Sequence, residues 1–153
     1  MSLFGPPNVE KLRAKRDLKG LLLALTSQSY PDTRRAARAA LTADVDLLVT
    51  GYLANNDAME AQMRTTKAPA SHKRVVLHGL MKDALAEIGP PAVPALLEAV
   101  RAAGGRNLTV IGEVLRKMAN CEKALTRALD DPDEHVGAAA ADALRAIAAR
   151  RDT

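Results

Sequence analysis

The stretch DALAEIGPPAVPALLEAV, residues 83–100, constrains the fold of this chain more than any other segment. Apolar side chains recur at helical spacing before Gly89 and again after Pro91, whereas one glycine and three prolines interrupt the middle. Gly89 suits the left-handed position that ends a helix, and the Pro90–Pro91 pair cannot continue one. Pro94 is tolerated in a first helical turn, where its missing N–H has no intrahelical partner. The stretch therefore predicts a corner between two helices that pack against each other.

A turn followed by an alanine-rich helix ending in Ala-Leu occurs both at residues 30–41 and at residues 133–144. Taken as register marks, four leucines are separated by 44, 30 and 29 residues: Leu41, Leu85, Leu115 and Leu144. This spacing indicates a repeat of about 30 residues with one enlarged unit. The first helices of the units are expected at 32–42, 72–88, 106–119 and 133–149, and the second helices at 17–27, 45–55, 91–103 and 121–130.

A two-helix unit of this size cannot bury its apolar stripe alone. We therefore expect an all-α fold, a right-handed α-solenoid of about four to five stacked two-helix units, with residues 1–153 forming one domain. Composition agrees, because the core must be built from alanine, leucine, valine, isoleucine and methionine. The chain has only one phenylalanine, two tyrosines and no tryptophan, and cores of this kind favour helices.

Helical periodicity is lost from Asp57 to Ser71, within a stretch of residues 55–71 that contains Pro69. One interpretation is an insertion or loop between repeats, with one short helix through Met63, since long surface loops cost little stability. The other is a binding loop at the rim of a concave face. Met59 and Met63 would then dock an apolar partner, although they would equally well cover a gap between two repeats.

Two parts of the chain carry a family resemblance. The run from Ala84 to Gly89 followed by Ala92 to Leu97 reads Ala-Leu-Ala-Glu-Ile-Gly and then Ala-Val-Pro-Ala-Leu-Leu. Together with residues 31–41 and 133–147, it resembles the HEAT-like repeat family in its short bacterial form, first associated with phycobilisome lyases. Residues 55–71 and 107–119 depart from that pattern. The resemblance implies stacked helix pairs, and it admits a bilin lyase or a subunit partnering one, for which the sequence marks no pigment pocket.

The sequence predicts no catalytic, cofactor or metal site. His72 and His78 are six residues apart and miss the i, i+3 or i, i+4 spacing of helical metal ligands, and His135 has no second histidine or cysteine nearby. Asp133 is expected to be an N-cap. Cys121, the lone cysteine, is expected to be a small buried hydrophobe. One cysteine cannot form an intrachain disulfide, and no apolar run approaches the ~20 residues of a membrane span, so we expect a cytoplasmic protein.

Charge is unevenly distributed in a chain of net charge +4. Residues 1–40 contain three acidic and eight basic residues, the latter being Lys11, Arg13, Lys15, Arg16, Lys19, Arg34, Arg35 and Arg38. A basic end of this kind either binds an anionic partner such as nucleic acid or serves as the solvated cap that a terminal repeat needs. Without tryptophan there is no evident platform for base stacking.

The function expected from these features is a non-catalytic scaffold that holds a protein or peptide on a concave face lined by second helices. Helical phase selects six candidate binding residues: Lys19, Asp46, Glu98, Arg101, Lys123 and Arg127. Nucleic-acid binding through the basic N-terminal end is the alternative. Oligomeric state stays open between monomer and homodimer, since Phe4 and the Pro6–Pro7 arm would serve either to cover an open end of the stack or to pair with a second copy.

Overall fold

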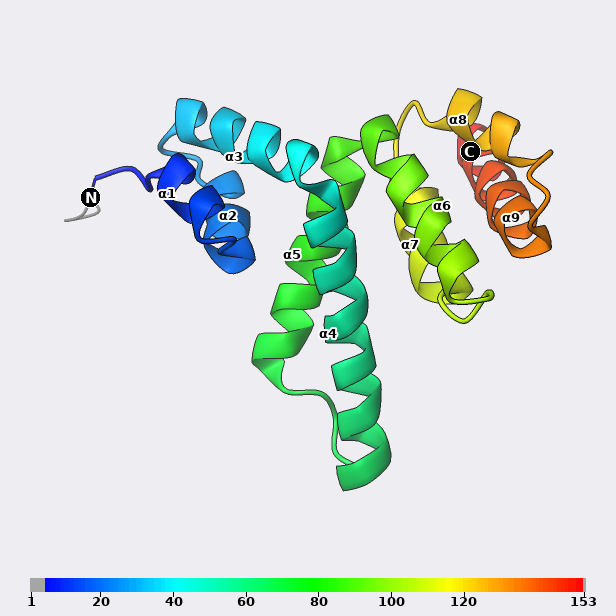
Figure 1. Ribbon diagram of the computed structural model, residues 1–153, viewed down its shortest axis with the longest axis horizontal. Coiled ribbons are helices and arrows are strands. Elements are labelled where there is room, and N and C mark those ends of the chain that lie inside the picture. The colour runs from blue at the N-terminus through cyan, green and yellow to red at the C-terminus, as the bar shows by residue number, and fades with distance from the viewer. Residues whose placement is uncertain (1–4, 153) are drawn as a thin grey trace.

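The computed structural model describes residues 5–152, so Phe4 lies outside the described residues. Every regular element in that range is helical, which confirms the all-α prediction (Figure 1). The elements are α1 (Val9–Ala14), α2 (Leu18–Leu25), α3 (Pro31–Ala43), α4 (Val45–Thr66), α5 (His72–Ile88), the 3₁₀ turn η1 (Pro90–Ala92), α6 (Val93–Ala102), α7 (Leu108–Lys117), α8 (Glu122–Ala128) and α9 (Glu134–Arg151).

The corner after α5 forms as the sequence predicts. Gly89 ends α5 at φ 73° and ψ −137°, a backbone conformation with positive φ that is open essentially to glycine alone. This is not the left-handed helical conformation that we expected, because ψ is extended rather than helical. Pro90 then begins η1, and Pro94 lies in the first turn of α6, where its lack of an N–H costs no hydrogen bond.

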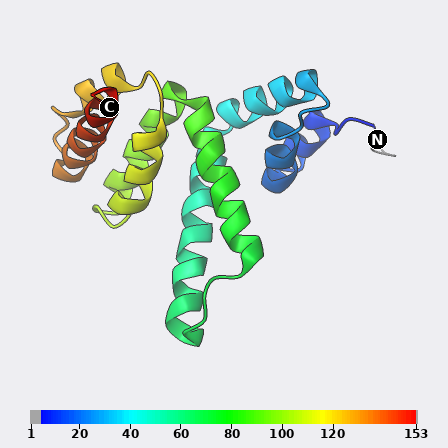
Figure 2. The same cartoon turned by 180° about the vertical axis from the view of Figure 1, so that it is seen from behind.

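The helices lie in a row from one end of the molecule to the other, and the two views in Figures 1 and 2 agree on this order. Contacts follow the chain. The predicted first helices pack in succession as α3 on α5, α5 on α7 and α7 on α9, whereas α2 packs on α4 and α4 on α6. The helices thus share one apolar core, in which Tyr52 is the one aromatic side chain among the described residues.

Tyr52 of α4 connects three helices in the middle of the row. Its side chain is fully buried, and its hydroxyl donates a hydrogen bond of 3.2 Å to the Val110 carbonyl of α7. Its ring stacks on that of His78 in α5, with ring centroids 4.5 Å apart. A single side chain of α4 therefore contacts both α5 and α7.

Helix α4 is the main departure from the sequence prediction. It continues to Thr66 instead of ending at Asn55, and only residues 67–71 form a loop before α5. Together, α4 and α5 make a long hairpin whose tip projects from the row (Figure 1). Asn55 is buried and donates to the Arg74 carbonyl across the hairpin at 3.1 Å. No side chain between residues 56 and 76 is buried, so this part of the hairpin lacks the apolar stripe on which the prediction relied.

Candidate binding groove between α6 and α8

A groove of about 420 Å³ lies between α6 and α8. Both helices pack on α9, which leaves a cleft between them. Its apolar lining comes from Val93, Pro94, Leu97, Ala124 and Ala128, and its polar lining from Glu98, Arg101, Arg127 and Asp131. An apolar floor with a few charged groups at its edge is the usual composition of a surface that takes a peptide side chain.

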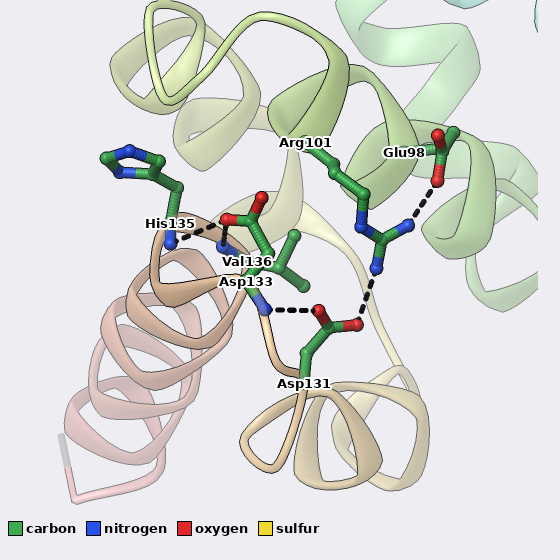
Figure 3. A network of polar contacts seen from close by, with 6 residues as sticks. All are labelled: Glu98, Arg101, Asp131, Asp133, His135 and Val136. Atoms are coloured by element: carbon green, nitrogen blue, oxygen red, sulfur yellow. Dashed lines mark hydrogen bonds and ion pairs between the residues drawn. The ribbon is translucent and has the colours of Figure 1, made fainter.

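One wall of the groove is a connected set of charged groups, which we call the Arg101 network (Figure 3). The Arg101 guanidinium pairs with Glu98 on its own helix and with Asp131, whose Oδ2 lies 2.6 Å from Nη2. The other carboxylate oxygen of Asp131 accepts the Asp133 N–H at 2.9 Å. The network therefore ties α6 to the turn that precedes α9.

The electrostatics of this wall follow from its hydrogen bonds. The backbone N–H of Asp133 and then the Arg101 guanidinium lower the pKa of Asp131, because both stabilise its carboxylate. The hydrogen bond to Asp131 in turn raises the pKa of Arg101. Both groups are thus charged at neutral pH and engaged with each other. By contrast, Arg127 has no carboxylate within ion-pair distance among residues 5–152, so its charge faces the groove uncompensated.

The backbone around the network is fixed at both ends. Asp133 caps α9 as predicted, its Oδ1 accepting the N–H groups of His135 at 2.9 Å and Val136 at 3.3 Å. After α6, Gly104 and Gly105 adopt φ values of 55° and 80° and end that helix. A Cβ on Gly105 would lie 2.6 Å from Nδ1 of the His135 ring, so only glycine permits this approach. The end of α6 is thereby held against the start of α9.

The structure brings together three of the six predicted binding residues: Glu98, Arg101 and Arg127. The other three lie elsewhere. Lys123 is exposed on α8 outside the lining of the groove, and Asp46 is exposed in the first turn of α4. Lys19 borders a different cleft, between α2 and α5. Helical phase identified which side of each helix faces outward, but it carried no information on which helices lie next to each other.

Sequence reasoning missed Asp131, which lies in the turn between α8 and α9. In this turn only Asp133 was assigned a role from the sequence, as the N-cap of α9. The available signal was its position: Asp131-Pro132-Asp133 precedes a helix, and an aspartate that accepts the N–H two residues ahead is a common local motif. Its pairing with Arg101, 30 residues earlier, depends on the packing of α6 beside α9 and has no local signature.

The basic N-terminal end is partly neutralised within the fold. Arg13 pairs with Asp44 at 2.7 Å, and the Arg13 hydrogen bond lowers the pKa of that carboxyl. Arg34 pairs with Glu87 at 3.2 Å, and Arg38 donates to the Glu87 carbonyl at 2.8 Å. Arg35 lies 3.5 Å from Asp32. Three of the eight basic groups in the first 40 residues are thus paired with carboxylates, which lowers the free positive charge at this end.

The remaining candidate groups have structural surroundings. Cys121 is fully buried, and this burial raises the pKa of its thiol. The His78 Nδ1 is buried without a hydrogen-bond partner, and desolvation followed by the nearby Lys82 lowers the pKa of the imidazole. Within the described part of the chain, no three His, Cys, Asp or Glu side chains lie close enough together to hold a metal ion.

Comparison of the chain with family models, with curated proteins and with solved structures gives no match in any of the three. Among the helices of residues 5–152, none combines the length and the apolar character needed to cross a lipid bilayer.

Proposed function

We propose that this protein is a helical-repeat scaffold that binds a protein or peptide segment in the groove between α6 and α8. The observation that carries the proposal is the pairing of an apolar floor with Arg127, an arginine that has no partner carboxylate within the described residues and borders the groove. A bound segment would place an apolar side chain on Leu97 and a carboxylate against Arg127, since arginine favours carboxylate partners.

The wider architecture in this proposal is a right-handed solenoid of HEAT-like repeats, with the groove on its concave side. Two observations support it. First helices pack on first helices from α3 to α9, and α2, α4 and α6 do the same, as expected when each unit contacts mainly its neighbours. In addition, the stretch of sequence that resembles the family forms a corner between two helices, from Gly89 to Pro94, as that family's repeats have there. The protein would act in the cytoplasm, where the free thiol of Cys121 stays reduced.

The Arg101 network has a positioning role in this proposal. It holds α6 at a fixed separation from the turn before α9, so the groove is formed before a partner arrives. Binding to a preformed groove avoids the entropy cost of ordering it. Arg101 is therefore a poor choice for testing contact with the partner, because its replacement would also release Asp131 and the turn.

The test is affinity capture from lysate of the source cells, with and without nuclease, using the wild-type protein and two variants. Arg127→Glu reverses the charge that faces the groove. Arg145→Glu is the matched control, because Arg145 is an exposed arginine on α9 outside the groove lining. We expect a nuclease-resistant, stoichiometric protein partner that the control retains and Arg127→Glu loses.

Three results would contradict the proposal. Capture that survives Arg127→Glu would place the contact elsewhere on the molecule. Loss of every partner after nuclease treatment would favour nucleic-acid binding through the basic N-terminal end instead, and binding would then weaken steeply with salt. Pigment that copurifies with the protein would favour a lyase of the bilin kind.

A further inference from the structure

A second groove runs along α5 on the side that faces α2. At its lower end a cleft of about 240 Å³ is lined by Lys19, Leu23, His72, Lys73, Val76, Leu77 and Leu80. A further cleft of about 240 Å³ continues from Leu80 and is lined by Leu22, Leu25, Thr26, Gln28, Arg34, Asp83, Ala84 and Glu87. Because Leu80 lines both, the two clefts form one surface, which we call the α2–α5 groove.

The length of the groove matches that of a helix. From His72 to Glu87 it follows α5 for fifteen residue steps, which at 1.5 Å per residue is about 22 Å. A bound helix of about 15 residues would lie along it for four turns. Grooves between two helices bind amphipathic helices through anchors at i, i+3, i+4 and i+7.

The lower end of the α2–α5 groove exposes apolar side chains. Leu23 is 53% exposed and Val76 is 45% exposed, two of the largest apolar exposures among the described residues. They come from different helices and border the same cleft, with Leu77 and Leu80 half-buried behind them. Solvent-facing apolar groups that gather in one concave place mark a binding surface more than scattered ones do.

The two ends of the α2–α5 groove differ in how their charged side chains are paired. At the lower end, neither Lys19 nor Lys73 has a carboxylate within ion-pair distance in the part of the chain that the structure describes. At the upper end, Glu87 is paired with Arg34 at 3.2 Å, and Asp83 lies 3.7 Å from Lys117. Positive charge is therefore uncompensated only beside the apolar cleft, where an occupant would need carboxylates.

We propose that the α2–α5 groove binds an acidic amphipathic helix of a partner protein. The leucine-type face of that helix lies on Leu23, Val76 and Leu80, and its carboxylates lie against Lys19 and Lys73. This inference goes beyond the proposed function, because the groove is formed by α2 and α5 and shares no lining residue with the α6–α8 groove. One scaffold would then hold two different segments, at opposite parts of the row of helices (Figure 1).

The experiment is a selection from a displayed library of helical 16-residue peptides, carried out on the wild-type full-length protein. Binding of the enriched peptides is then measured by fluorescence anisotropy. Leu23→Glu and the pair Lys19→Glu/Lys73→Glu alter the groove. The controls are Leu129→Glu, which changes an exposed leucine at the C-cap of α8, and Lys15→Glu/Lys123→Glu, which changes the same number of exposed lysines elsewhere.

We expect the selection to enrich peptides with an apolar stripe at helical spacing and with aspartate or glutamate beside it. Affinity should fall at least about tenfold with Leu23→Glu and with Lys19→Glu/Lys73→Glu, and by less than about twofold with either control or with Arg127→Glu. Circular dichroism checks that each variant is folded. We expect all of them to fold, because the replaced side chains are exposed.

Four results would overturn the proposal. They are enrichment of basic peptides, an absence of enriched peptides, equal losses in the groove variants and the controls, and a wild-type dimer that Leu23→Glu converts to a monomer. The last, measured by light scattering, would identify a second copy of the chain as the occupant. None of these results bears on the groove between α6 and α8, whose test uses Arg127→Glu.

Discussion

We expect the packing of the helices against one another to depend more on Tyr52 than on any other single side chain. It is the only aromatic residue in the described core, and it contacts the backbone of α7 and the His78 ring of α5 while lying on α4. Two substitutions separate its contributions. Tyr52→Phe removes the hydroxyl and keeps the ring, whereas Tyr52→Ala removes both.

The magnitudes follow from burial. Loss of the hydroxyl removes one hydrogen bond to the Val110 carbonyl, so Tyr52→Phe should lower the free energy of unfolding by about 0.5–1.5 kcal/mol. Loss of a fully buried ring leaves a cavity, so Tyr52→Ala should cost about 3–5 kcal/mol. For a chain of this length, 1 kcal/mol corresponds to about 2–4 °C in Tm.

Urea unfolding followed by circular dichroism measures both values, and the slope m reports whether the whole chain unfolds together. Tyr30, which is not buried, provides the control substitution Tyr30→Phe, with an expected effect within about 0.5 kcal/mol. A loss of less than about 1 kcal/mol for Tyr52→Ala would refute this reasoning. So would an unchanged urea midpoint for Tyr52→Phe together with a large change for Tyr30→Phe.

Two further predictions concern the backbone at Gly105 and the titration of His78. Gly105→Ala places a Cβ on a residue with positive φ and close to the His135 ring, so it should lower the free energy of unfolding by about 1–2 kcal/mol or more. The loss should be smaller when the same substitution is made in a His135→Ala protein. Equal losses in the two proteins, measured by urea unfolding, would contradict the contact. Burial and then the nearby Lys82 lower the pKa of His78 below 6.5, and Glu113 opposes this shift. As the pH falls below 6.5, the His78 side chain therefore takes up a proton in the unfolded state before it does so in the folded state. The free energy of unfolding should decrease over this pH range. His78→Phe keeps a ring against Tyr52 and should flatten this loss between about pH 5 and pH 8; a urea midpoint whose pH dependence matched that of the wild type would exclude His78 as its source.

Most helix positions were predictable because burial imposes periodicity. The 72–88 helix was predicted with its observed bounds, and the corner at Gly89 followed from residues that cannot continue a helix. Helix α4 was predicted too short for the same reason. Beyond Asn55 none of its side chains is fully buried, so a test based on buried apolar spacing detects nothing there. The extension is held by local bonds instead, such as Asn56 to Glu60 at 3.0 Å.

Candidate residues were predictable only as far as one helix determines them. Exposure of Glu98, Arg101 and Arg127 follows from helical phase, and the groove unites them because α6 and α8 share α9 as a support. The pairing of Arg101 with Asp131 and the placement of Lys19 beside Val76 depend on contacts between distant segments. A single sequence contains no direct signal for such contacts.

The most direct test of the central claim is site-specific photo-crosslinking from the groove between α6 and α8. A photoreactive amino acid replaces Glu98, an exposed residue of the groove lining, in one protein and Arg145 in another, so that Arg127 is kept in both. The crosslinked products from source cells are identified by mass spectrometry. The account predicts one partner protein crosslinked from position 98 and absent from position 145. A partner crosslinked equally from both positions, or only from position 145, would contradict it.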